Sequence, residues 1–103
     1  MKDSRKWSKQ RKKLGFDDRD LWSLDHTIVK FVLPRLIRFR EVASGYPGNL
    51  TEKKWNKILD QMIYSMKAIC DEWENTAIGA QDEEKKINRG LYLFGKYFRG
   101  LWW

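Results

Sequence analysis

The stretch that decides the fold is Gly15-Phe-Asp-Asp-Arg-Asp-Leu-Trp-Ser-Leu-Asp-His-Thr-Ile-Val-Lys-Phe-Val-Leu-Pro-Arg-Leu-Ile-Arg-Phe-Arg40. An acidic turn leads into a segment whose apolar residues recur at helical spacing in two adjacent rows. The first row comprises Leu21, Leu24, Ile28, Val32, Leu36 and Phe39, and the second comprises Trp22, Val29, Leu33 and Ile37. A helix that is apolar over this much of its circumference is normally buried by several neighbours, and a chain of 103 residues supplies few of them. The segment therefore predicts self-association.

Local signals indicate where this first helix begins and ends. Asp18 or Asp20 is expected to begin it, because either carboxylate can accept hydrogen bonds from the free N–H groups of the first turn. Pro34 lacks a backbone donor and crowds the preceding turn, which predicts a kink or break near Val32–Leu33. The segment Ser44-Gly-Tyr-Pro-Gly48 is typical of a turn and should end the helix.

A second helix is predicted to begin at Thr51, a good N-cap residue, with Glu52 in its first turn. Its apolar stripe has heptad-like spacing and consists of Trp55, Leu59, Met62, Met66, Ile69 and Trp73. A loop is expected to follow over residues 75–81.

A third helix is predicted to begin near Asp82, with the apolar stripe Ile87, Leu91, Phe94, Phe98 and Leu101. Gly90, Gly95 and Gly100 recur along it, although glycine costs about 1 kcal/mol relative to alanine inside a helix. Their regular spacing indicates close backbone approach or local bends. The aromatic segment 98–103 is expected to pack against another subunit.

The predicted fold is therefore all-α, because no alternating strand pattern of useful length is present. It is a small bundle of three helices, or four if the helix kinked at Pro34 is counted as two, assembled as a homo-oligomer. No apolar run approaches the roughly 20 residues of a membrane-spanning helix, and no secretory signal is evident. A cytoplasmic protein without a membrane partner is expected.

The positive charge is concentrated at one end of the chain. The net charge is +7, and residues 1–15 account for +6 of it, which leaves the remaining residues nearly neutral. We expect residues 1–14 to form a flexible basic tail and residues 15–103 to form a single helical domain. Such a tail is compatible with polyanion binding and equally with a role in solubility.

The sequence favours a non-catalytic protein without metal or cofactor. A single histidine, His26, and a single cysteine, Cys70, are too few for a histidine- or cysteine-rich metal site. The aspartates of the acidic turn offer hard oxygen ligands for Mg²⁺, but helix capping explains two of them and the EF-hand spacing is absent. Neither a phosphate-binding glycine loop nor a nucleophile elbow is present.

A local arginine cluster is the strongest candidate site. Arg35 and Arg38 are three residues apart and share a helix face, and Lys96 and Arg99 form a second pair. Guanidinium groups bind phosphates in a bidentate manner and aromatic rings stack on bases, for which Trp22 and Tyr97 are candidates. The alternative is that these cations form a solvated helix edge or surface ion pairs.

The chain also resembles a group of small, largely uncharacterised bacteriophage accessory proteins. The resemblance lies in residues 15–25, in Phe31-Val-Leu-Pro-Arg-Leu36, in Gly45-Tyr-Pro-Gly48, and in Gly90-Leu-Tyr-Leu-Phe-Gly-Lys-Tyr-Phe98 with Leu101-Trp102. It implies an accessory phage protein made in the cytoplasm of the infected bacterium. It implies no assigned binding residue.

Two functional hypotheses follow from these patterns. The first is a helical homo-oligomer that sequesters an anionic ligand, with a cyclic nucleotide second messenger of host antiviral defence as the candidate. The second is a nucleic-acid- or host-protein-binding module that uses the basic N-terminal tail and exposed aromatic residues.

Overall fold

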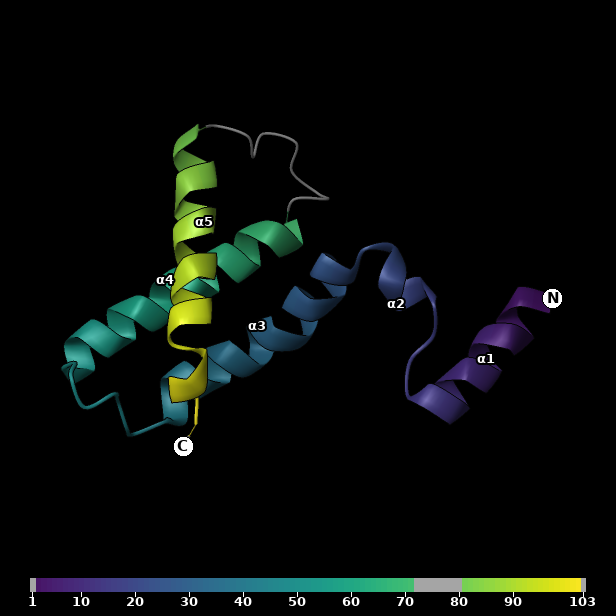
Figure 1. The fold of residues 1–103 in the computed structure, drawn as a ribbon, viewed down its shortest axis with the longest axis horizontal. Helices are drawn as coiled ribbons and strands as arrows, with labels where there is room; N and C mark the ends of the chain where they lie inside the picture. The colour runs from purple at the N-terminus through teal and green to yellow at the C-terminus, as the bar shows by residue number, and fades with distance from the viewer. Residues whose placement is uncertain (1, 72–80, 103) are drawn as a thin grey trace.

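The computed structural model describes residues 2–71 and 81–102, and this part of the chain is helical without strands. Its elements are α1 Lys2–Leu14, α2 Arg19–Trp22, α3 Leu24–Val42, α4 Glu52–Asp71, α5 Gln81–Lys96 and the 3-10 helix η1 Phe98–Gly100 (Figure 1). The all-α prediction is confirmed. The predicted number of three helices is wrong, because the described residues form five α-helices.

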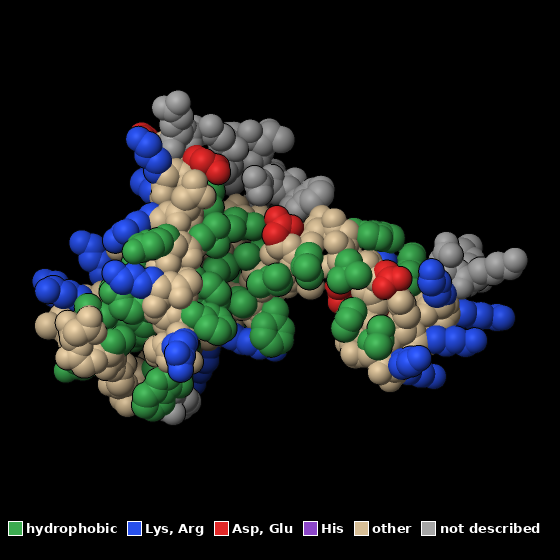
Figure 2. All heavy atoms as spheres, viewed as in Figure 1, with side chains coloured by type: hydrophobic (Ala, Val, Ile, Leu, Met, Phe, Trp, Pro, Cys, Tyr) green, Lys and Arg blue, Asp and Glu red, His purple; other side chains and the backbone are tan. Residues whose placement is uncertain are grey.

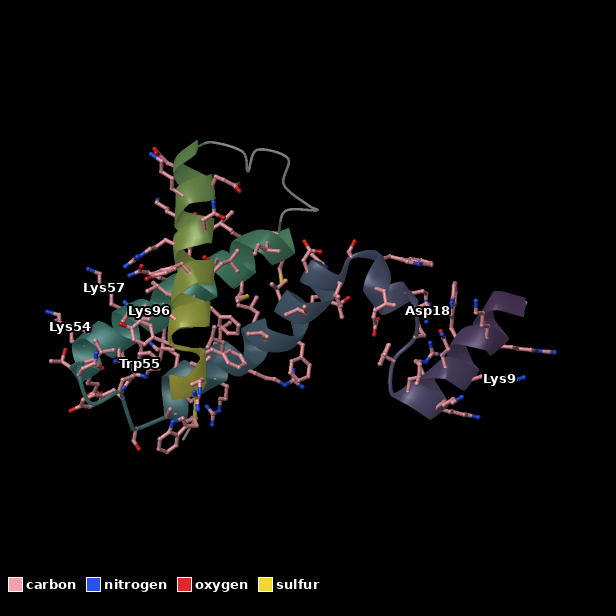
Figure 3. The ribbon with its side chains drawn as sticks, viewed as in Figure 1. Lys9, Asp18, Lys54, Trp55, Lys57 and Lys96 are labelled. Atoms are coloured by element: carbon pink, nitrogen blue, oxygen red, sulfur yellow. The ribbon has the colours of Figure 1, made fainter. Side chains whose placement is uncertain are left out.

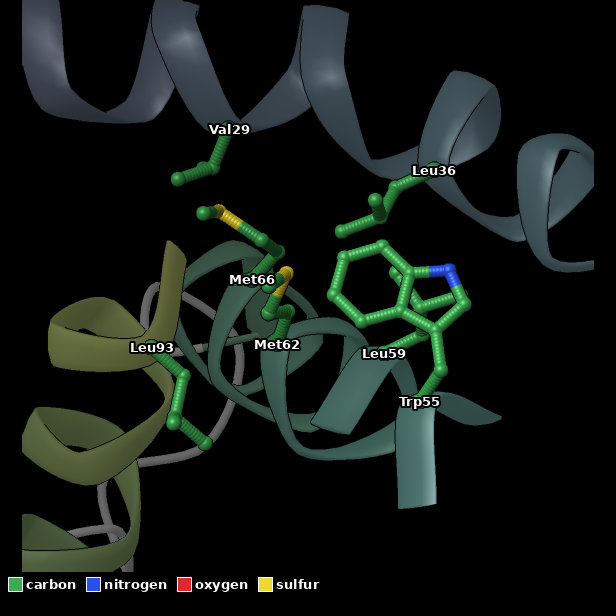
Figure 4. Packing of buried hydrophobic residues seen from close by; sticks show 7 residues of the cluster. All are labelled: Val29, Leu36, Trp55, Leu59, Met62, Met66 and Leu93. Carbon is green, nitrogen blue, oxygen red and sulfur yellow. The ribbon is translucent and has the colours of Figure 1, made fainter. Parts of the chain in front are cut away.

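Helices α3, α4 and α5 form the body of the molecule, with α4 packed against both of the others. The core lies where the three helices meet and is formed by Val29, Leu36, Trp55, Leu59, Met62, Met66 and Leu93 (Figure 4). Four of these residues come from the stripe predicted for α4, and a buried apolar side chain contributes about 1.5–3 kcal/mol. The Thr51 hydroxyl accepts a hydrogen bond from the Lys54 N–H at 3.2 Å, which confirms Thr51 as the N-cap.

Helices α4 and α5 cross at Gly90. A Cβ atom placed on Gly90 would lie 1.8 Å from the Ser65 hydroxyl oxygen and 2.4 Å from the Gln61 carbonyl oxygen. The fully buried Ser65 hydroxyl donates to the Ile87 carbonyl at 2.7 Å, so the crossing leaves this polar group satisfied. Close backbone approach is thus confirmed at Gly90, whereas the space around Gly95 is open.

This crossing sets which side of α5 is buried. Residues 87, 90 and 93 face inward, while Leu91 of the predicted stripe is 39 % exposed and Phe98 is 59 % exposed. In a single copy the predicted stripe is therefore only partly buried. The close approach of Gly90 to Ser65 requires this side of α5 to face α4.

The first long helix is not broken at Pro34 and is instead interrupted near its start. Helix α3 continues through Pro34, and the break lies at Ser23, whose φ of −137° and ψ of 71° separate α2 from α3. The Arg35 guanidinium donates to the Phe31 carbonyl at 2.8 Å, in the turn that the proline ring crowds.

Residues 2–22 form an N-terminal arm that projects from the body (Figure 1). Residues 2–14, which the sequence predicts to be part of a flexible tail, form the regular helix α1. Lysine, arginine, glutamine and leucine are good helix formers, and α1 is rich in them. Gly15 adopts a φ of +86°, which glycine tolerates, and so turns the chain after α1.

Asp17 holds the arm together. Its carboxylate is nearly inaccessible and accepts hydrogen bonds from the Arg19 guanidinium at 2.8 and 2.9 Å, from the Arg19 backbone N–H at 3.0 Å and from the Arg11 guanidinium at 2.6 Å. These partners, Arg19 first, hold the pKa of Asp17 far below its ordinary value of 3.8. Asp18 holds the N-cap position of α2, as predicted, but the carboxylate that bonds to the first turn is that of Asp17.

Candidate functional site: an apolar groove between α3 and α5

Several large apolar side chains on α3 and α5 remain exposed on one face of the body. Ile28 is 48 % exposed and Phe31 is 61 % exposed, and both lie on α3. Figure 2 shows apolar side chains gathered on this face between α5 and α3. A contiguous apolar patch of this kind is typical of an interaction surface.

The exposed residues border two hollows that share Phe94. One hollow, of about 430 Å³, has Val29 and Met66 at its inner side and is bordered by Asp25 and Glu84. The other, of about 240 Å³, is lined by Phe31, Val32, Arg35, Leu36, Phe39, Phe94, Phe98 and Leu101. We call the two together the α3–α5 groove. It is apolar along its length and carries charge only at its edges.

Arg35 lies at the edge of this groove. Its guanidinium carbon is 3.7 Å from the centre of the Phe31 ring, and its Nη1 donates to the Phe31 carbonyl. No ion pair joins Arg35 to a carboxylate within the described residues. Its charge thus remains available to an anion at the groove.

Arg38 has a different environment from Arg35. Its side chain is 71 % exposed and forms an ion pair with Glu41 at 3.0 Å, one turn along the same helix. Exposed pairs of this type contribute little, about 0.2–1 kcal/mol. Arg38 therefore fits the solvated-edge alternative in a single copy of the chain.

The other four predicted site residues lie elsewhere. Tyr97 is half-buried against Trp55, with ring centres 5.7 Å apart, and the Lys96 ammonium lies 5.4 Å from the Tyr97 ring centre. Arg99 is exposed on η1. Trp22 is 73 % exposed in the arm, where it contacts Trp7 edge to face. The six predicted residues are therefore not brought into one pocket in a single copy.

His26 and Cys70 have structural positions. The Nε2 atom of His26 lies 3.2 Å from the Cys70 carbonyl oxygen and so connects the start of α3 to the end of α4. Burial raises the pKa of the Cys70 thiol, which favours the unreactive protonated form. In residues 2–71 and 81–102, no three histidine, cysteine or carboxylate side chains gather as a metal site requires.

Sequence reasoning missed the groove itself and the role of Asp17. The sequence does contain an indication of the groove, because α5 carries more apolar positions than contact with α4 alone can cover. Nothing in the sequence distinguishes Asp17, because three neighbouring aspartates are equally able to cap a helix.

No helix in the described part of the chain is long and apolar enough to cross a membrane. No family model, no curated protein and no solved structure matches this chain.

Proposed function

We propose that this protein is a non-catalytic binding protein that self-associates through the α3–α5 groove and sequesters an anionic ligand. The observation that carries the proposal is the groove, where Phe31, Leu91 and Phe98 are exposed although they are large and apolar. Such surface is costly to leave in water, at about 25 cal/mol per Å². Covering it would stabilise an assembly.

A second copy of the chain is the proposed occupant, because the arm has matching chemistry. The arm exposes Leu21 and Trp22 beside the basic helix α1, while Asp25 and Glu84 border the groove. Apolar residues would meet apolar residues, and the basic helix would meet the acidic edge. A repeated contact of this kind builds a homo-oligomer.

The proposed ligand is an anionic nucleotide, with a cyclic nucleotide of host antiviral defence as the first candidate. Arg35 supports this choice, because its guanidinium lies at the groove without a carboxylate partner among the described residues. If assembly brings copies of Arg35 and Arg38 together, these crowded cations at the interface need a counter-anion. The setting proposed from the sequence resemblance is a phage accessory role in the cytoplasm of the infected bacterium.

Both parts of the proposal can be tested on one preparation. Sedimentation over a wide concentration range should give a mass above that of one chain, and a monomer throughout would contradict self-association.

Cyclic di- and trinucleotides should then raise the thermal unfolding midpoint, because a ligand that binds only the native state stabilises it. Arg35→Ala should remove this shift, while Lys67→Ala, which removes one exposed cation away from the groove, should retain it. The absence of a shift with every nucleotide would reject the ligand.

A second candidate function is a nucleic-acid- or host-protein-binding module, and helix α1 favours it. Its last turn carries Arg11, Lys12 and Lys13, and Lys9 projects outward from the helix (Figure 3). The two functions differ in one consequence. Arg35→Ala would abolish nucleotide capture and would leave binding by such a module nearly unchanged, because Arg35 lies outside α1.

A further inference from the structure

The side of the body that carries the exposed face of α4 has a second groove, which is basic. Its first hollow, of about 490 Å³, is lined by Arg40, Glu52, Lys53, Asn56, Lys57 and Asp60. Its second, of about 570 Å³, is lined by Lys57, Asp60, Gln61, Tyr64, Lys85, Lys86 and Arg89. The two hollows share Lys57 and Asp60, and together we call them the α4–α5 basic groove.

The helical period explains why these residues share one face. Positions 53, 57, 60, 61 and 64 lie on the side of α4 opposite to the buried residues Trp55, Leu59, Met62 and Met66. Lys57 projects outward from α4 (Figure 3), and Figure 2 shows lysine and arginine side chains gathered along α4 and α5. From residue 53 to residue 64 the groove follows α4 for about 16 Å.

The charge of this groove is largely uncompensated. Its lining has six cationic side chains and two carboxylates, Glu52 and Asp60, and a third carboxylate, that of Glu83, accepts the hydrogen bond of the lining Tyr64. Asp60 already accepts a hydrogen bond from the Arg40 guanidinium at 3.0 Å. Within the described residues, no ion pair joins Lys57, Lys85 or Arg89 to a carboxylate. Because residues beyond the first fifteen are nearly neutral as a whole, this is a local concentration of positive charge.

The groove also contains an aromatic ring. Tyr64 is 36 % exposed, its hydroxyl donates to the Glu83 carboxylate, and the Lys86 ammonium lies 5.9 Å from its ring centre. The bond to Glu83 occupies the polar end of Tyr64, and its ring lines the groove beside the Lys86 ammonium. Cations along a groove with an aromatic platform between them are the combination that binds single-stranded nucleic acid.

We propose that the α4–α5 basic groove binds single-stranded nucleic acid, with its lysines and arginines on the phosphates and Tyr64 under a base. The length of the groove suits the backbone of a few nucleotides. The site is independent of self-association through the α3–α5 groove, and none of its residues belongs to the proposed nucleotide site.

The test compares three double variants of the full chain that have the same net charge. Lys57→Gln with Lys85→Gln removes two cations from the basic groove, Lys30→Gln with Lys67→Gln removes two exposed cations outside it, and Lys9→Gln with Lys12→Gln removes two from α1. The probe is a fluorescein-labelled oligothymidylate of about 12 nucleotides, followed by anisotropy across a salt series. Circular dichroism and sedimentation establish that fold and mass are unchanged.

We expect the groove variant to bind about 10-fold more weakly than wild type, with a salt slope reduced by about 1.4, since each lost phosphate contact contributes about 0.7. The variant at Lys30 and Lys67 should stay within about twofold of wild type. Equal losses in all three variants would show a response to net charge and overturn the proposal. A loss confined to the α1 variant would assign binding to the arm, and the absence of binding by wild type would also overturn it. Because the groove variant retains Arg35, its thermal response to cyclic nucleotides should persist, so failure here is distinguishable from failure of the proposed function.

Discussion

At the scale of single residues, Asp17 shows how one side chain fixes a segment that lacks a core. The hydrogen bonds that Asp17 accepts from Arg11 and Arg19 join α1 to α2, together with the contact between Trp7 and Trp22. The pKa of Asp17 is lowered in the folded arm. Its ionised carboxylate therefore stabilises the folded arm at pH values above the ordinary pKa of 3.8. That contribution to stability is lost as the pH falls through the lowered pKa that Asp17 has in the folded state.

Hydrogen exchange of the arm can test this linkage. Protection of the Arg19 amide, which bonds to the Asp17 carboxylate, should be constant above about pH 4 and should decrease as the pH falls below it. Asp17→Asn should weaken this protection at neutral pH and remove its acid dependence. Asp18→Asn is the matched control, because the Asp18 side chain makes no capping bond, and it should behave like wild type. Equal behaviour of the two variants would show that Asp17 does not hold the arm.

At the scale of helices, the contrast between α4 and α5 shows what spacing can predict. The stripe of α4 is buried as predicted at Trp55, Leu59, Met62 and Met66, because α4 has helices on two sides and needs a broad apolar face. The buried side of α5 was predicted less well. Its rotation depends on the contact between Gly90 and Ser65, which belongs to two helices and is invisible in the period of either.

The crossing of α4 and α5 can be tested by adding one methyl group. Gly90→Ala should lower the free energy of unfolding by about 1–3 kcal/mol, because its Cβ would overlap the Ser65 hydroxyl and the Gln61 carbonyl. Gly95→Ala is the matched control, since nothing lies within 4 Å of its Cβ, and it should be neutral or stabilising by up to about 1 kcal/mol. Urea unfolding measures both. A neutral Gly90→Ala would show that the helices can separate at the crossing without cost.

At the scale of the whole molecule, a single copy is more extended than a compact domain. Its radius of gyration is 16.7 Å, whereas about 13 Å is typical of 100 residues. The arm, which projects from the body, contributes to this extension (Figure 1). The sequence predicted an excess of apolar helix surface over available neighbours. It could not predict where on the molecule this surface lies, because the groove depends on how α5 rotates on α4. It also could not predict that Arg35 is separated from Lys96 and Arg99, because these residues lie on different elements.

Neighbouring positions on α5 offer a direct test of assembly through the α3–α5 groove. Leu91 borders the groove and is 39 % exposed, whereas Tyr92 is 55 % exposed and lies beside Arg89 and Lys96. Leu91→Asp would place an unpaired charge in the proposed interface and should weaken self-association by more than about 10-fold, measured by sedimentation. Tyr92→Asp adds the same charge one residue away and should retain the wild-type mass. If both substitutions dissociate the assembly equally, or neither does, the groove is not its interface.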